Sequence, residues 1–115
     1  ISQVTAAPFA TGTPTGIAYH APSNKLIVSF STGNNLYAVN LDGSSPVLIY
    51  SNSSIINTPR GLAVDSAGYI YVSSTGTDTV EKLSFDGTTA TRATPGPFLG
   101  PNAYTQNVTS IAVVE

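Results

Sequence analysis

The sequence lacks cysteine entirely and contains one histidine, His20. Without cysteine the chain has no disulfide, no thiol nucleophile and no thiolate metal site. A lone histidine excludes the paired imidazoles of most zinc sites and a credible Ser/His/Asp triad, and the G-x-S-x-G motif is absent. We therefore expect no catalytic residue, no metal site and no cofactor. His20 itself is predicted to lie on the surface or in a turn at the end of a strand.

Charged residues are scarce: the 115 residues include four lysines and arginines against six acidic residues, for a net charge of -2. The basic residues are spread along the chain at Lys25, Arg60, Lys82 and Arg92. Because they do not cluster, nucleic acid and anionic membranes are not expected as partners. No apolar run approaches the roughly 18 residues that cross a bilayer, so no membrane span is predicted.

Serine and threonine fill many of the polar positions in place of charged residues. This composition favours an exported protein, secreted or held at the cell surface. Two N-x-S/T triplets, at Asn52 and Asn107, are candidate glycosylation sites in such a compartment.

The main feature that the chain does contain is an internal repeat. "PTGIA" at 14–18 returns as "PRGLA" at 59–63, and "LDG" at 41–43 returns as "FDG" at 85–87. The offset is 45 residues for the first pair and 44 for the second. Further apolar positions coincide at the offset of 44: Leu26, Val28, Leu36 and Val39 fall on Ile70, Val72, Val80 and Leu83. A repeat of this length is the signature of a propeller or solenoid unit.

The residue pattern inside each unit has the period of strands. "KLIVSF" and "YIYVSS" are β-branched and aromatic runs, and "NLYAVNL" and "TVEKLSF" alternate between two environments. The predicted fold is all-β, with four-stranded antiparallel meanders at about 16–51 and about 61–93. Asp-Gly pairs at 42–43 and 86–87 predict hairpins with positive φ at both central residues. Terminal strands are expected in "ISQV" and at about 109–114, where a further blade would start, and residues 1–115 are expected to form a single propeller-type unit.

The head of each unit carries a glycine, Gly16 or Gly61, two residues after a proline. We expect these glycines to allow close approach of neighbouring backbones near a crowded axis. Pro14 and Pro59 stand where a strand begins and no ladder donor is needed.

The second unit, "TPRGLAVDSAGYIYVSSTGTDTVEKLSFDG", resembles one repeat of the NHL and SMP-30-like β-propellers. Blades of that family open on P-x-G-I/L-A-V-D and end an apolar third strand in D-G. The first unit departs from the pattern, because Tyr19 and His20 stand where the family has Val-Asp. The resemblance implies propeller blades and a ring of about six of them. It does not imply an activity, and no metal-ligand set of the SMP-30-like hydrolases can be matched here.

A chain of two blades leaves two large apolar faces unless further blades cover them. We therefore expect chains to complete a ring or an open stack with other copies. If the terminal strands are shared between chains, no sheet edge is left bare.

The carboxylates are predicted to form turns or to be solvated, with Asp65 accepting backbone N–H bonds. Tyr37, Tyr69 and Tyr71 are expected in core or inter-blade packing. The loops 31–35, 51–60, 74–78 and 94–108 are expected to emerge on one face of the propeller. That face would bring together five candidate contact residues for protein or carbohydrate: Asn34, Asn35, Arg60, Asp78 and Tyr104.

Two functions fit these observations. The first is a non-enzymatic extracellular or cell-surface binding or structural module that assembles through its blade faces. The alternative is a fragment of a larger NHL or SMP-30-like propeller enzyme, a hydrolase or lyase, with its catalytic residues outside this chain.

Overall fold

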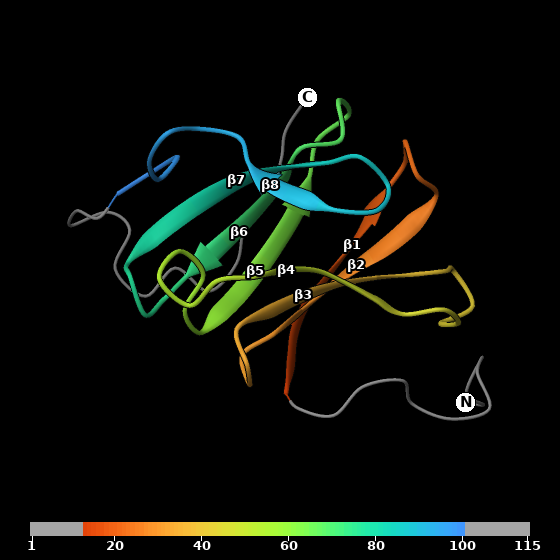
Figure 1. Ribbon diagram of the computed structural model, residues 1–115, viewed down its shortest axis with the longest axis horizontal. Helices are drawn as coiled ribbons and strands as arrows, with labels where there is room; N and C mark the ends of the chain where they lie inside the picture. Colours follow the sequence, from red (N-terminus) through yellow and green to blue (C-terminus); the bar gives the residue numbers. More distant parts are fainter. Residues whose placement is uncertain (1–12, 101–115) are drawn as a thin grey trace.

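The computed structural model describes residues 13–100, which form two four-stranded antiparallel sheets (Figure 1). The first sheet has the order β1 (Pro14–His20), β2 (Lys25–Phe30), β3 (Asn35–Val39) and β4 (Val47–Ser51). The second has the order β5 (Pro59–Val64), β6 (Ile70–Ser74), β7 (Thr79–Phe85) and β8 (Ala90–Arg92). The all-β prediction and the two meanders are confirmed. The predicted terminal strands, at "ISQV" and 109–114, lie outside the described residues.

The alternation of side chains in each strand sets which face of each sheet is apolar. The central strands pair residue for residue, with Val28 opposite Tyr37 in the first sheet and Val72 opposite Glu81 in the second. Both sheets shift register at the same repeat position, between Pro14 and Gly16 and again after Pro59. The two blades therefore share this backbone irregularity as well as the side-chain pattern.

The Asp-Gly turns differ from the prediction, because only their glycines have positive φ, 86° at Gly43 and 98° at Gly87. Each aspartate instead accepts a backbone N–H from two residues on: Asp42 from Ser44 at 2.9 Å and Asp86 from Thr88 at 2.8 Å. An aspartate that bonds forward in this way makes an Asx turn, which needs no left-handed backbone at the aspartate.

The two sheets pack face to face, with β1 against β5 and β4 against β8. Buried side chains from both sheets form one core between them: Ile27, Leu36, Ala38, Ile49 and Ile56 with Leu62, Ile70, Val72, Leu83 and Ala90. The stacking of these faces is the arrangement of neighbouring propeller blades. We refer to the first sheet as blade 1 and to the second as blade 2.

Gly16 lies where β1 comes closest to β5. A β-carbon at Gly16 would stand 2.6 Å from the carbonyl oxygen of Arg60 and 3.1 Å from the β-carbon of Leu62. The neighbouring Thr15 hydroxyl donates to the carbonyl of Pro59 at 2.7 Å. The expectation that this glycine permits close backbone approach is confirmed.

Blade 1 has a second apolar face, which we call face A, directed away from blade 2. Val28, Phe30 and Val39 form a buried cluster there, with Leu26 and Tyr37 packed against it. Ile17 and Tyr19 extend this face and are exposed, Ile17 by 63%. Among residues 13–100 there is no helix of a length and apolarity suited to crossing a membrane.

Candidate functional site

Three loops meet at one end of the blades, which we call the connection end: the β2–β3 turn at 31–34, the link between blades at 52–58, and the β6–β7 turn at 75–78. Asn34 accepts the backbone N–H of Thr58 at 2.7 Å through its side-chain oxygen. Gly76 donates its N–H to the carbonyl of Asn57 at 2.8 Å, and Thr75 donates its hydroxyl to the carbonyl of Thr58 at 2.8 Å. The predicted grouping of these three loops is confirmed.

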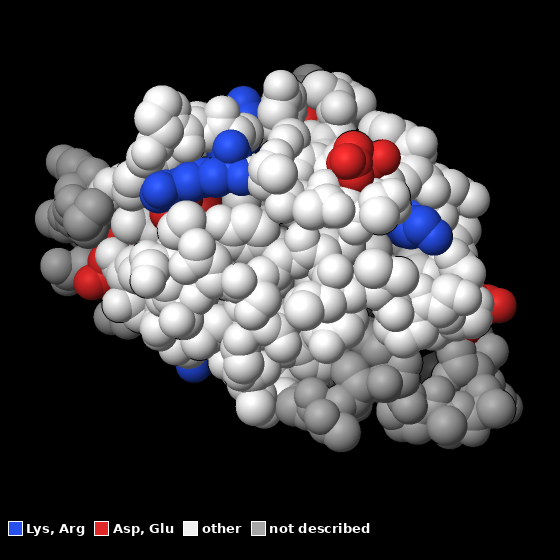
Figure 2. Space-filling model, in the orientation of Figure 1, with Lys and Arg blue, Asp and Glu red and all other residues white. Residues whose placement is uncertain are grey.

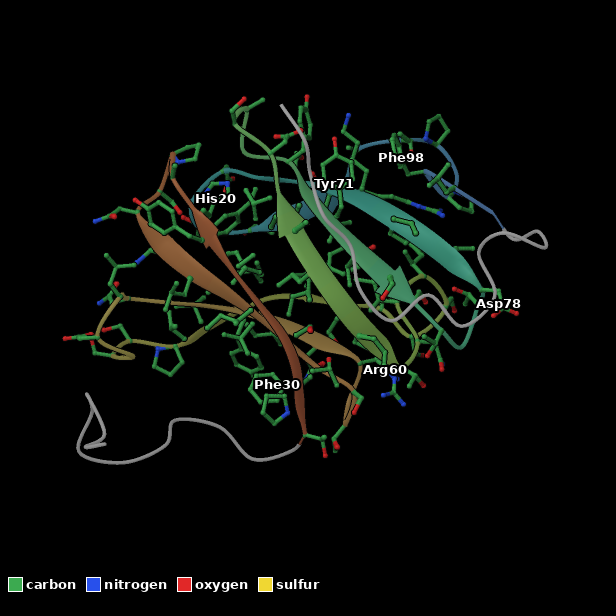
Figure 3. The ribbon with its side chains drawn as sticks, turned by 180° about the vertical axis from the view of Figure 1, so that it is seen from behind. His20, Phe30, Arg60, Tyr71, Asp78 and Phe98 are labelled. Carbon is green, nitrogen blue, oxygen red and sulfur yellow. The ribbon has the colours of Figure 1, made fainter. Side chains whose placement is uncertain are left out.

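The predicted contact residues at this end have different surroundings. The Asn34 side chain holds the link between blades, whereas Arg60 is exposed at the second position of β5. Asp78 is half-buried with φ of 55°, the counterpart of Asn34 at 56°. Asn35 is half-buried at the start of β3 beside Gly33. Figure 3 shows Arg60 and Asp78 on separate segments of blade 2.

Two of the predicted site residues, Tyr104 and Asn107, lie outside the described residues. Asn52 is exposed in the loop that leaves β4, and its side-chain oxygen accepts the N–H of Ser54 at 3.0 Å. The roles assigned to all of these residues stay predictions.

Residues 94–100 run back along β7 toward the connection end, and the rest of the predicted loop, 101–108, lies outside the described residues. Leu99 exchanges two backbone hydrogen bonds of 3.0 Å with Val80, so the chain returns to the edge of β7 after β8. Leu36, the counterpart of Val80, pairs with Tyr50 of β4, so Leu99 takes the place of a fourth-strand residue. The intervening segment carries Phe98 onto the outer surface of blade 2.

An aromatic cluster surrounds the ammonium group of Lys82 on the outer surface of blade 2, which we call face B. The Nζ atom lies 4.2 Å from the ring centre of Tyr69, 5.5 Å from that of Phe98 and 5.7 Å from that of Tyr71. The Tyr71 and Phe98 rings meet edge to face with their centroids 5.3 Å apart. Figure 3 labels both residues in the same part of blade 2. The Tyr71 hydroxyl donates to Asp65 at 2.9 Å. The ammonium group is therefore held by aromatic rings within the face.

A buried ion pair lies on the other side of blade 2, inside the core. Glu81, predicted to be a turn-forming or solvated carboxylate, is 1% exposed. Arg92 donates to it through Nε at 2.9 Å and through Nη2 at 3.1 Å, and Thr79 donates its hydroxyl at 3.2 Å. The prediction was wrong because strand alternation turns position 81 toward blade 1. Burial raises the pKa of the adjacent Tyr50, with the Arg92 charge opposing it and the Glu81 charge adding to it.

His20 ends β1 beside a turn, as predicted, but it is buried at 1% exposure and does not lie on the surface. Its Nε2 lies 2.9 Å from the carbonyl of Gly68 in blade 2, which makes Nε2 the protonated nitrogen because a carbonyl can only accept. Nδ1 then accepts from the hydroxyl of Ser23 at 2.7 Å. The ring also meets Phe85 edge to face at 4.9 Å. The histidine thus ties the end of β1 to blade 2, at the end of the first blade opposite Phe30 in Figure 3.

A shallow cavity of about 230 Å³ lies beside this histidine, where the two blades meet. Its lining is formed by His20, Pro22, Ser23, Phe85, Asp86 and Gly87. Ser23 and His20 have the contact distance of a nucleophile and a base. Both side chains are however held by hydrogen bonds that stabilise the fold: His20 bonds Ser23 within one four-residue turn and Gly68 across the blade boundary.

Three aspartates have pKa values below the ordinary value of 3.8. Hydrogen bonds from the Ser44 hydroxyl and backbone lower the pKa of Asp42, and backbone N–H groups of Thr89 and Thr88 lower that of Asp86. For Asp65 burial raises the pKa, but the Tyr69 N–H and the Tyr71 hydroxyl outweigh it. The expected turn role of Asp65 is confirmed. All three carboxylates serve as hydrogen-bond acceptors in turns.

The described part of the chain contains no group of three or more His, Asp and Glu side chains placed to share a metal ion. On the surface shown in Figure 2, the few charged atoms lie apart from one another among uncharged ones, except where acidic atoms border one basic side chain.

No protein-family model matches the chain, and no curated protein matches it. Among solved structures, a chain in the crystal structure of a nidogen/laminin complex is similar, with a TM-score of 0.59 and 22% sequence identity. The match covers 75% of this chain and 34% of that one, so the present chain spans about a third of its length. That neighbour is a β-propeller protein. The fold of this chain is β-propeller-like.

Proposed function

We propose that the chain is a non-enzymatic binding or structural module that acts outside the cell or on its surface and joins its blades to further blades. Face A carries the proposal: Ile17 and Tyr19 are exposed on the same surface as the buried cluster of Val28, Phe30 and Val39. A contiguous apolar patch of this kind marks an interaction site more often than a surface that stays in contact with water. The finer assignment to NHL or SMP-30-like blades rests on the repeat motif.

The side chains best suited to catalysis support a structural role. His20 binds Gly68 and Ser23, and Glu81 is paired with Arg92. A group held in this way has little freedom to exchange protons with a substrate. The chain's own copies are the partners we propose first, and protein or carbohydrate could bind at the connection end through Arg60.

The alternative is that the chain forms part of a larger propeller enzyme. The observation that favours it is the extent of the structural match, 34% of the neighbour's chain. Two blades make up one third of a six-bladed ring, and six is the number of blades that the resemblance implies. In that case the surfaces described here would meet blades of the same polypeptide.

Static light scattering on the purified chain at micromolar concentration tests the proposal. Three times the monomer mass of 11.8 kDa indicates a ring of three chains, and an unbounded distribution indicates a filament. A stable mass of 11.8 kDa contradicts assembly through blade faces. Stoichiometric binding of a divalent metal, together with hydrolysis that a chelator abolishes, contradicts the non-enzymatic assignment.

A further inference from the structure

We propose that copies of this chain associate head to tail, with face A of one copy packed on face B of the next. The inference rests on the proposed function and makes it specific, since it states which surfaces meet. Its basis is the contact between blade 1 and blade 2, which the repeat allows us to continue beyond the chain.

Face A repeats a surface that is already packed within the chain. The side chains of blade 2 that pack on blade 1 include Leu62, Val72 and Leu83, all at 8% exposure or less. At the repeat offsets their counterparts in blade 1 are Ile17, Val28 and Val39. These three lie on face A, so face A repeats the surface that blade 2 already uses to bind a blade.

Face B corresponds in the same way to the face of blade 1 that meets blade 2. The side chains of blade 1 that receive blade 2 include Ala18, Leu36 and Ala38. Their counterparts at the repeat offsets are Ala63, Val80 and Lys82, which lie on face B. Face B therefore repeats the receiving surface, and no other described strand packs on either outer face.

The two inner strands show the same continuation. Gly16 of blade 1 admits the carbonyl oxygen of Arg60, which a β-carbon would meet at 2.6 Å. Gly61 is the counterpart of Gly16, and Thr15 is that of Arg60. In a second copy placed by the same relation, the Thr15 backbone would approach Gly61. Exposed Arg60 would then extend toward the carbonyl of Pro14, as the Thr15 hydroxyl extends to Pro59 within the chain.

On face B, Lys82 differs in character from its counterpart in blade 1, because it stands in the place of Ala38. Burying an ammonium group against an apolar face is costly unless the charge is compensated. Here the rings of Tyr69, Tyr71 and Phe98 surround it, so face A need supply no carboxylate. Six alternating side chains of face A carry no charge: Ile17, Tyr19, Leu26, Val28, Tyr37 and Val39. We therefore expect association to depend on apolar burial and to persist at high salt.

Two charge-introducing variants, one on each face, test the arrangement. Ile17→Glu alters face A, where the side chain is 63% exposed, and Leu99→Glu alters face B, where it is 50% exposed. Ser53→Glu, at an exposed loop position, places the same charge on neither face. Circular dichroism checks that each variant keeps its strands, and Tyr19→Glu with Phe98→Glu forms a second pair if either fails.

Sedimentation velocity then measures each chain alone and the two face variants mixed at equal concentration. If the contact is head to tail, each face variant alone stays monomeric, because every contact needs an intact face A on one copy and an intact face B on the next. The mixture should give a species of twice 11.8 kDa that grows no further, since the remaining ends are both blocked. Ser53→Glu should assemble as the unaltered chain does.

The outcomes separate the two proposals. If the unaltered chain and Leu99→Glu assemble equally well while Ile17→Glu stays monomeric, face A meets another face A, and the head-to-tail inference is wrong while the proposed function stands. If the unaltered chain stays at 11.8 kDa, both are wrong. Failure of the mixture to exceed monomer mass also overturns the inference.

Discussion

At the scale of single residues, Gly16 shows how a missing side chain controls the contact between blades. A β-carbon there would press on the backbone of Arg60, which cannot move aside without displacing β5. We expect Gly16→Ala to lower the free energy of unfolding by about 1–3 kcal/mol, the range for overpacked cores. Gly96→Ala is the control, because a β-carbon there meets nothing within 4 Å. Urea denaturation of both variants measures the difference, and equal stabilities would contradict the close approach of β1 and β5.

The turn aspartate Asp86 predicts how stability responds to acid. Backbone N–H groups of Thr89 and Thr88 hold its pKa below the ordinary value of 3.8. The stabilisation is complete above the unfolded value and is lost as the pH falls through the lower folded pKa. Asp86→Asn, which keeps one side-chain acceptor, should flatten the loss of stability below about pH 4. Urea midpoints measured from pH 6 to pH 3 give the comparison, and parallel curves for the two chains would refute the role of this carboxylate.

The residues that sequence reasoning placed correctly are those with local hydrogen bonds, such as Asp65 in its turn. His20 and Glu81 were misplaced because their burial depends on which face of a strand meets the other blade. The partners that make their burial tolerable, Gly68 and Arg92, are 48 and 11 residues away in the chain. A repeat alignment gives no sign of such pairs. The counterpart of Glu81 in blade 1 is Tyr37, which carries no charge.

At the scale of strands, the ion pair between β7 and β8 fixes the outer part of blade 2. Removing one partner leaves a buried charge without compensation, whereas replacing both by apolar residues removes the need for it. We expect Arg92→Leu to cost about 3–5 kcal/mol, and the double variant with Glu81→Leu to cost clearly less. A urea double-mutant cycle measures the coupling. Additive losses would show that the two side chains do not act as a pair.

The link between the blades offers a second test at this scale. Asn34 has a left-handed backbone with φ of 56°, and its side chain holds the N–H of Thr58. Asn34→Gly keeps the backbone conformation and loses only the hydrogen bond, whereas Asn34→Ala adds backbone strain. We expect losses of roughly 1 kcal/mol for glycine and more for alanine, measured by urea denaturation. A greater loss for glycine than for alanine would contradict this account of the turn.

The strands themselves could be predicted because period-two alternation and turn residues are local signals. The return of 94–99 to the edge of β7 could not, because it depends on a backbone pairing between Val80 and Leu99 across a proline-rich segment. The aromatic setting of Lys82 follows from that return, since Phe98 reaches the cluster only through it.

At the scale of the whole molecule, the two sheets stack as neighbouring blades, and every surface described above depends on this stacking. The inner strands β1 and β5 then lie side by side, and the packing of Gly16 on Leu62 is the closest reporter of that contact. A chain folded as two independent meanders would keep every hydrogen bond within each sheet but would lose the packing of Gly16 on Leu62. Stacked blades are therefore distinguished from independent meanders only by a measurement of a contact between the blades.

Nuclear Overhauser effects between the α-protons of Gly16 and the side chain of Leu62 provide it directly. They are measured on the isotopically labelled chain at a concentration where light scattering gives a single mass. We predict strong effects, because a β-carbon on Gly16 would lie 3.1 Å from the β-carbon of Leu62. Effects within each sheet, such as those between Val28 and Tyr37, serve as the reference. Their presence without the contact between Gly16 and Leu62 would contradict the stacked-blade fold.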